Sequence, residues 1–98
     1  MIQNLWKKRW FYITTEKRLL ENGYEDVKIL TDFNYDTALV GVTHDNRAVY
    51  DFNKMIDWLV ETEKFTYEEA IECIEYNTIR ALHYMGSDAP IVMYPLMD

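Results

Sequence analysis

The stretch DFNKMIDWLVETEKFTYEEA, residues 51–70, decides the fold. Its first residue, Asp51, is of a type that caps helix N-termini, and apolar residues recur after it at helical spacing. The residues expected on the buried face are Phe52, Met55, Ile56, Leu59 and Val60. The pattern predicts an amphipathic helix over residues 52–63.

A second helix begins within the same stretch. Thr66 followed by Glu69 is the pattern of a capping box, in which each side chain satisfies a backbone N–H of the other residue. An apolar stripe follows at Ala70, Ile71, Ile74, Ala81, Leu82 and Met85. It predicts a helix that runs as far as Gly86, with a kink at Asn77-Thr78.

The residues on either side of the two helices have β character. Before them, residues 27–30, 38–42 and 48–50 are rich in β-branched and apolar side chains, with turn formers between them. Residues 43–47 are expected to join the last two as a hairpin loop. After the helices, Pro90 and Pro95 bracket residues 91–94, a short strand that would pair with an edge of the sheet.

The first 24 residues are expected to form a helical N-terminal segment. Apolar residues at Leu5, Trp6 and Trp10 suggest a short first helix, Thr14 or Thr15 a break, and Gly23 the end of a second helix. The chain is thus predicted to be one α+β domain over residues 1–98. A small antiparallel sheet of three or four strands would pack against two amphipathic helices.

Composition favours a cytoplasmic protein that folds without disulfides or a bound metal. Apolar residues make up 49% of the 98 residues, enough for a modest core, and the single cysteine, Cys73, excludes an internal disulfide. The N-terminus does not have the charge order of a signal peptide. No apolar run approaches the roughly 20 residues of a membrane helix.

The net charge of −7 is unevenly distributed. Residues 1–30 carry a net charge of +2, whereas residues 31–98 carry −9. Such an acidic body is repelled by nucleic acid phosphates and by anionic membranes. We therefore expect no direct nucleic acid binding and no membrane binding, and a partner selected by charge would be a basic protein surface.

Acidic residues on the two predicted helices are the main functional candidates. Six of them are expected to face outward and to bind a partner: Asp57, Glu61, Glu68, Glu69, Glu72 and Glu75. Like charges one turn apart destabilise a helix slightly, so the cluster has a cost. The alternative is a solvated helix face, and the helix dipole partly explains Glu68 and Glu69.

The hairpin loop is a second candidate contact point. His44, Asp45 and Arg47 would form its tip, unless they only shape the turn and face solvent. An enzyme built around His44, Asp45 and Cys73 would need these side chains to converge, and no sequence signature indicates that they do. The chain lacks metal-ligand spacings and a Gly-rich loop, so no enzyme, cofactor or metal is predicted.

Aromatic residues suggest self-association. The chain has eight tyrosines and three tryptophans, more than a small core needs. Those that cannot all point inward are Tyr50, Trp58, Tyr67, Tyr76 and Tyr84. Exposed Tyr and Trp are typical of protein interfaces, and a homodimer would be the simplest outcome.

Residues 35–96 resemble short acidic proteins of Firmicutes and of their phages and mobile elements. The resemblance lies in the whole-segment pattern, through VGVTHDNRAVYDFNKMIDWL, TYEEAIECIEYNTIRAL and APIVMYPL. It carries over no catalytic or binding residue. In most such relatives the position of His83 is proline, which implies a helix that ends nearer Leu82.

If that origin holds, the size and charge resemble those of phage-encoded defence inhibitors, including anti-CRISPR proteins. Many of these lack enzymatic activity and engage basic nucleic-acid sites. The resulting hypothesis is a non-enzymatic protein-binding module, an anti-CRISPR-type inhibitor that presents its acidic helical face to a nuclease complex. The alternative is a small host structural or regulatory protein that homodimerises through exposed aromatic residues.

Overall fold

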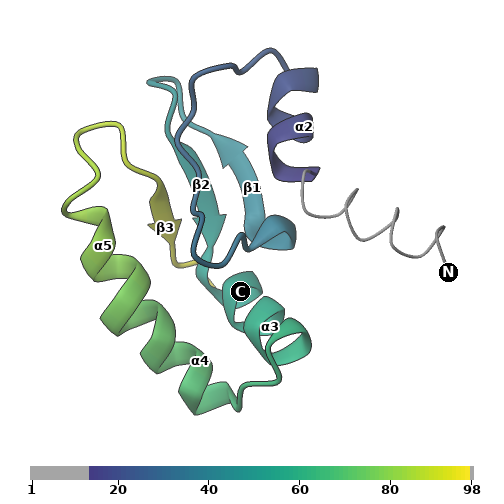
Figure 1. Cartoon of the computed structure of the whole chain (residues 1–98), viewed down its shortest axis with the longest axis vertical. Coiled ribbons are helices and arrows are strands. Elements are labelled where there is room, and N and C mark those ends of the chain that lie inside the picture. The colour runs from purple at the N-terminus through teal and green to yellow at the C-terminus, as the bar shows by residue number, and fades with distance from the viewer. Residues whose placement is uncertain (1–13, 98) are drawn as a thin grey trace, which may run out of the picture.

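The computed structural model describes residues 14–97 and shows an α+β protein with a small sheet (Figure 1). The strands are β1 (Leu39–Val42), β2 (Ala48–Asp51) and β3 (Ile91–Met93). The helices are α2 (Thr14–Glu21), η1 (Asp36–Ala38), α3 (Phe52–Thr62), α4 (Tyr67–Cys73), η2 (Ile74–Ile79) and α5 (Arg80–Leu82). The predicted α+β class is confirmed. The first helix expected before Thr14 lies outside the described residues.

The sheet is mixed, with the strand order β1-β2-β3. β1 and β2 are antiparallel and joined by the predicted loop, in which Asn46 has a φ of 64°. β3 pairs with β2 in parallel, with Val49 beside Ile91. The expectation of a purely antiparallel sheet is therefore wrong for this pair. The chain returns to the sheet through α3, α4 and α5, and such a crossover allows parallel pairing.

Residues 27–30 do not form the predicted strand. They run extended but outside the sheet, and the N–H of Leu30 donates to the hydroxyl of Tyr50 over 3.1 Å. The hydroxyl of Tyr50 thus accepts the backbone bond that a neighbouring strand would accept if residues 27–30 were in the sheet. The hydrophobic pattern of this segment reflects burial on the core, where Leu30 is 7% exposed, and not strand pairing.

Local capping signals place the helix ends. α2 ends at Gly23, whose φ is 87°, and the N–H groups of Gly23 and Tyr24 bond to the carbonyls of Leu20 and Leu19. This is the Schellman pattern. The carboxylate of Asp51 accepts from the N–H of Lys54 at the start of α3. Both bonds of the predicted capping box between Thr66 and Glu69 are present at the start of α4.

α4, η2 and α5 form one continuous helical unit (Figure 1). Its middle part, Ile74–Ile79, is π-helical and contains Asn77 and Thr78, where the sequence suggests a kink. The unit ends at Leu82 and not at Gly86, to which the apolar stripe would extend it. After Leu82 the backbone hydrogen bonds join residues three apart, as in turns. The N–H of Met85, for example, donates to the carbonyl of Leu82.

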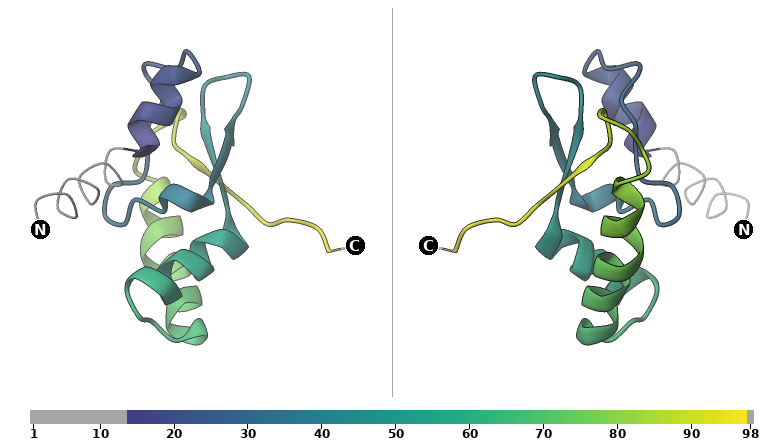
Figure 2. Two further views of the ribbon diagram at one scale, coloured as in Figure 1. Left: turned by 90° about the vertical axis from the view of Figure 1, so that its right-hand side faces the viewer. Right: turned by 90° about the vertical axis from the view of Figure 1, so that its left-hand side faces the viewer.

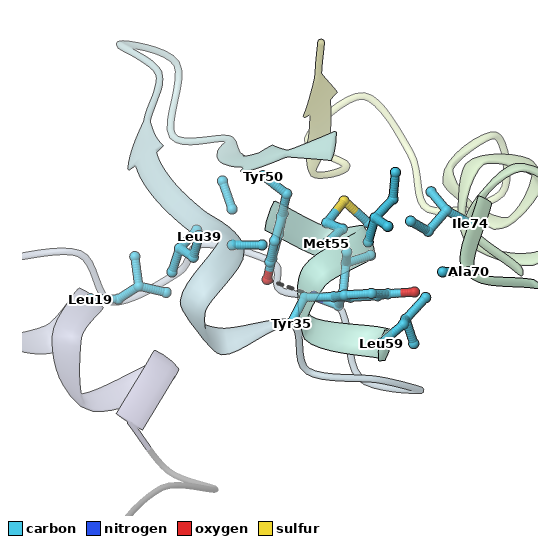
Figure 3. Packing of buried hydrophobic residues seen from close by; sticks show 12 residues of the cluster. Leu19, Tyr35, Leu39, Tyr50, Met55, Leu59, Ala70 and Ile74 are labelled. Atoms are coloured by element: carbon cyan, nitrogen blue, oxygen red, sulfur yellow. Dashed lines mark hydrogen bonds between the residues drawn. The ribbon is translucent and has the colours of Figure 1, made fainter. Parts of the chain in front are cut away.

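The core lies between the sheet and the helices and is rich in aromatic rings (Figure 3). Tyr35 and Tyr50 are both almost fully buried, and their ring centroids lie 6.5 Å apart. Trp58 packs on Tyr35 with a centroid distance of 5.3 Å. Aliphatic residues of the helices complete the core, among them Met55, Ile56, Leu59 and Ile74.

A polar cluster fixes α2 to the turn before β1. The hydroxyl of Thr15 donates to the carboxylate of Asp36 over 2.6 Å, and both residues are buried. The guanidinium of Arg18 lies 3.6 Å from the same carboxylate and donates to the carbonyls of Asp36 and Leu39. These bonds anchor the outer edge of the sheet to α2.

None of the described helices, between residues 14 and 97, combines the length and apolarity needed to cross a membrane.

Candidate functional site

We refer to the continuous helix formed by α4, η2 and α5 as the α4–α5 unit. Its acidic residues lie on its outer surface. Glu68 and Glu72 in α4 and Glu75 in η2 are all exposed, at spacings of four and three residues. Residues four apart on an α-helix have Cβ atoms about 5–6 Å apart. Glu68 and Glu72 are such neighbours on α4, and Glu75 follows them near the start of the π-helical segment η2.

Asp57 and Glu61 form a second pair, one turn apart and exposed, on α3. α3 packs against α4, and a short connector joins the end of one helix to the start of the other (Figure 1). The two acidic sets thus belong to neighbouring helices. We refer to Asp57, Glu61, Glu68, Glu69, Glu72 and Glu75 as the acidic helical residues.

None of the acidic helical residues forms an ion pair with a described residue. The salt bridges of the described chain join Arg18 to Asp36 and Lys28 to Asp88, away from α3 and α4. Glu69 has a structural function, because its carboxylate accepts from the N–H of Thr66 in the capping box. The other carboxylates remain available to a partner.

Four of the acidic helical residues lack a local stabilising function. Glu68 lies in the first turn of α4, where the helix dipole favours an acid. Glu61 has the opposite placement, in the last turn of α3, which contains no base. A negative charge at this end of a helix is unfavourable. Asp57, Glu72 and Glu75 have no capping bond either.

Exposed tyrosines accompany the acids on the α4–α5 unit and in the turn just after it. The side chains of Tyr67, Tyr76 and Tyr84 are 62%, 65% and 90% exposed, respectively. Tyr50 is fully buried and Trp58 half-buried. The prediction that these five aromatic residues do not all point inward is confirmed. The exposed surface of this unit therefore combines carboxylates with aromatic rings.

The hairpin tip is built largely from its own polar groups. The hydroxyl of Thr43 donates to the carboxylate of Asp45, and this bond holds the pKa of Asp45 below its ordinary value. The Nε of Arg47 donates to the carbonyl of Ala89 over 2.9 Å, which ties the hairpin to the chain before β3. His44 is exposed. These bonds give Asp45 and Arg47 structural functions.

The residues considered for an enzyme do not come together. Cys73 is half-buried at the end of α4, which lies at the opposite end of the molecule from the hairpin loop with His44 and Asp45 (Figure 1). His83 is exposed in the turn after α5. No three His, Cys, Asp or Glu side chains in residues 14–97 are grouped to hold a metal ion.

The π-helical segment contacts a buried tyrosine that the sequence does not single out. The hydroxyl of Tyr35 bonds to that of Thr78 over 3.2 Å. Burial raises the pKa of Tyr35 to about 12, with a smaller opposite effect of the bond to Thr78. Tyr35 thus remains protonated, and its position in the core indicates a structural function. No sequence signal marks the contact, because the two residues are far apart in the chain.

A hollow with a volume of about 250 Å³ lies between α2 and β1. Arg18 and Asn22 are its most polar lining residues. The two nitrogens of Arg18 that face the strand are already bonded to backbone carbonyls. This hollow therefore offers few free polar groups to a ligand.

The C-terminal residues are exposed in a way that the sequence reasoning missed. Tyr94 is 55% exposed, Leu96 96% and Met97 89%. The apolar residues after Pro95 were a signal for such an extension, since no helix or strand pattern accommodates them. We call residues 94–97 the C-terminal arm.

No protein-family model matches the chain, and neither does any curated protein or solved structure.

Proposed function

We propose that this protein is a non-enzymatic, cytoplasmic protein-binding module whose acidic helical residues engage a basic nucleic-acid-binding site of another protein. The supporting observation is that Asp57, Glu61, Glu72 and Glu75 are exposed, have no ionic partner among the described residues and fill no cap. Such carboxylates are free to meet lysines and arginines of a partner.

The stability cost of these residues favours a function over simple solvation. Glu68 and Glu72 are a like-charge pair at i,i+4, and such pairs each destabilise a helix by a few tenths of a kcal/mol. Glu61 adds a negative charge to the negative end of α3. If these positions only had to face solvent, glutamine or lysine would suit them equally well.

The spacing of the carboxylates suits a basic groove. Cβ atoms about 5–6 Å apart along a helix face repeat negative charge at a short interval, as the phosphates of a nucleic acid strand do at about 3.4 Å of helix axis each. The exposed rings of Tyr67 and Tyr76 would add apolar contacts of the kind found at the centres of interfaces. Together these features support nucleic-acid mimicry.

The most specific form of the proposal is an anti-CRISPR-type inhibitor from a phage or mobile element, with a nuclease complex as its target. It is supported by the small size, by the net charge of −9 over residues 31–98 and by the resemblance of residues 35–96 to proteins of phages and mobile elements. The proposal predicts inhibition of target DNA cleavage when the purified protein is added to a susceptible nuclease complex.

The electrostatic mechanism is tested with a partner captured from lysate at low salt. Changing Glu68, Glu72 and Glu75 together to Gln should weaken binding at least tenfold, which equals about 1.4 kcal/mol. Affinity of the unchanged protein should fall as salt rises, because exposed charges are screened.

The matched control removes three exposed acids at the other end of the molecule, with the changes Glu21→Gln, Glu25→Gln and Asp26→Asn. It alters the net charge by the same amount, so it should reduce affinity by much less. Equal weakening in both variants, or binding that ignores salt, would contradict the proposed site.

The second candidate is a host structural or regulatory protein that homodimerises through exposed tyrosines on the α4–α5 unit and in the turn after it. Tyr67, Tyr76 and Tyr84 favour it, because large exposed rings are enriched at interfaces. Changing all three to Ser should then convert a salt-insensitive dimer into a monomer in sedimentation experiments. A dimer that survives this change excludes the tyrosine interface.

A further inference from the structure

The face of the sheet turned away from the helices has an apolar centre. Tyr50 and Val92 are paired neighbours that point into the core. Side chains alternate across a strand, so the neighbouring pairs Val49–Ile91 and Asp51–Met93 point to the opposite side. We call Gly41, Val49, Ile91 and Met93 the outer sheet face.

The outer sheet face has no cover among the described residues. α2 and the α4–α5 unit lie together on the other side of the sheet (Figure 2). A Cβ built at Gly41, the neighbour of Val49 on β1, would meet no atom within 4 Å. Val49, Ile91 and Met93 are each only partly buried. Solvated sheet faces ordinarily carry polar residues, and parallel strand pairs are ordinarily covered on both faces.

The C-terminal arm leaves the body on this uncovered side. Figure 2 shows the chain after β3 running away from α2 and α5. The ring of Tyr94 packs on that of Phe52 with a centroid distance of 4.6 Å, which fixes the start of the arm. Leu96 and Met97 follow with almost no contact to the rest of the chain.

We propose that the outer sheet face and the C-terminal arm form the interface of a twofold homodimer. The chain contains both parts of such an interface, a flat apolar face and an apolar arm beside it. A twofold interface joins the same patch on both copies, so the patch must complement itself. Two sheets with apolar faces pack in this way at a separation of about 10 Å.

Charge supports a second copy as the occupant. Side-chain alternation places Arg47, just before β2, and Asp51, at its end, on the same side as Val49. The side chain of each makes one hydrogen bond within residues 14–97, that of Arg47 through Nε to the carbonyl of Ala89 and that of Asp51 through Oδ1 to the N–H of Lys54, so each keeps further polar atoms for a contact between copies. When two copies pack with their β2 strands antiparallel, Arg47 of one copy lies near Asp51 of the other. The acids of the α4–α5 unit lie on the far side of each copy, which keeps like charges apart (Figure 2).

Area explains why the arm is needed. Three strands at a spacing of about 4.8 Å and four residues at a rise of about 3.3 Å give a patch of only about 200 Å². A standard interface buries about 800 Å² on each partner. The arm has to supply much of the difference by reaching over the other copy.

The decisive variant is Gly41→Lys. It removes no contact within one copy, since the added Cβ meets open space, but it places a charged side chain at the proposed interface. Sedimentation of the unchanged chain should show a dimer that persists in high salt, because the contact is mainly apolar. Gly41→Lys should be monomeric with the circular dichroism spectrum of the unchanged chain, and its melting temperature should no longer rise with protein concentration. Leu20→Lys, on exposed α2, is the control and should remain dimeric.

A second variant tests the arm. Changing Leu96 and Met97 to Ser leaves the core intact and should raise the dimer dissociation constant at least tenfold. A monomeric unchanged chain, or a dimer that tolerates both Gly41→Lys and the arm variant, overturns this proposal. Partner binding through the acidic helical residues is a separate measurement, so either proposal can fail alone.

Discussion

The segment before β1 and the unit of sheet and helices after it are held in place by different kinds of bond. Residues 14–38 contain two short helices, and side chains do most of the anchoring, through Thr15, Arg18 and the bond from Leu30 to Tyr50. Residues 39–93 are held by strand pairing, continuous helices and caps.

The difference shows where the fold depends on single residues. Backbone bonds in a ladder or helix are repeated, so one side chain can change while the element remains. A side chain that bonds to backbone in an irregular segment has no substitute. The segment before β1 should therefore be the more sensitive of the two to loss of a polar group, and the less sensitive to loss of an apolar one.

Truncation of a buried leucine in each region should give the largest effects. Leu59→Ala in α3 should lower the free energy of unfolding by about 4 kcal/mol, because the side chain is fully buried in a rigid helix. Leu30→Ala should cost about 2 kcal/mol, since the irregular segment can relax into the space. Urea unfolding measures both. Equal losses would show that the two regions pack with the same rigidity.

Removal of the Asp36 carboxylate should have the next largest effect. Asp36→Ala should destabilise the protein by about 2 kcal/mol, because the buried hydroxyl of Thr15 and the guanidinium of Arg18 lose their acceptor. Asp36→Asn keeps an oxygen for Thr15 and should recover part of the loss. Thermal unfolding of the three proteins tests this, and an Asn variant no better than Ala would assign the effect to the charge.

The bond between Leu30 and Tyr50 gives a smaller effect. Tyr50→Phe leaves the ring in the core but removes the acceptor for the N–H of Leu30, at a cost of about 1.5 kcal/mol. Amide hydrogen exchange should also quicken at Leu30. Tyr76→Phe, which removes an exposed hydroxyl, serves as the control and should change neither quantity. Unchanged exchange at Leu30 would mean that packing alone holds this segment.

Loss of a cap in the regular region should have the smallest effect. Thr66→Ala removes the acceptor for the N–H of Glu69 and should cost about 1 kcal/mol, with the rest of α4 intact. Helix content by circular dichroism should hardly change. A large loss of helix would show that the capping box nucleates the whole α4–α5 unit. In that case the regular region, too, would depend on a single side chain.

Predictability from sequence follows the same division. The start of α3 at Asp51, the capping box at Thr66 and the hairpin loop were predictable, because each depends on residues close in the chain. The exposed acids and tyrosines of the α4–α5 unit followed from helical spacing. The proposed partner and the proposed dimer face are not derivable from these local patterns.

Distant contacts account for the rest. The pattern of residues 27–30 is that of a strand, but Tyr50 takes the place of a neighbouring strand, and only the fold brings the two together. The same holds for the structural function of Arg47, whose acceptor is the carbonyl of Ala89. Periodicity indicates that a segment is buried. It does not specify the group that satisfies its backbone.

The sequence by itself determined the α+β class, the two amphipathic helices with their caps and the acidic character of their outer surface. These properties arise from spacing and from bonds between near neighbours. Only the tertiary structure decided that β3 lies parallel to β2, that residues 27–30 stay outside the sheet and that no segment within residues 14–97 covers the outer sheet face. The physical reason is that strand pairing and burial join segments that are far apart in the sequence. Which segments meet depends on the packing of the whole chain, and a local sequence pattern does not contain this information.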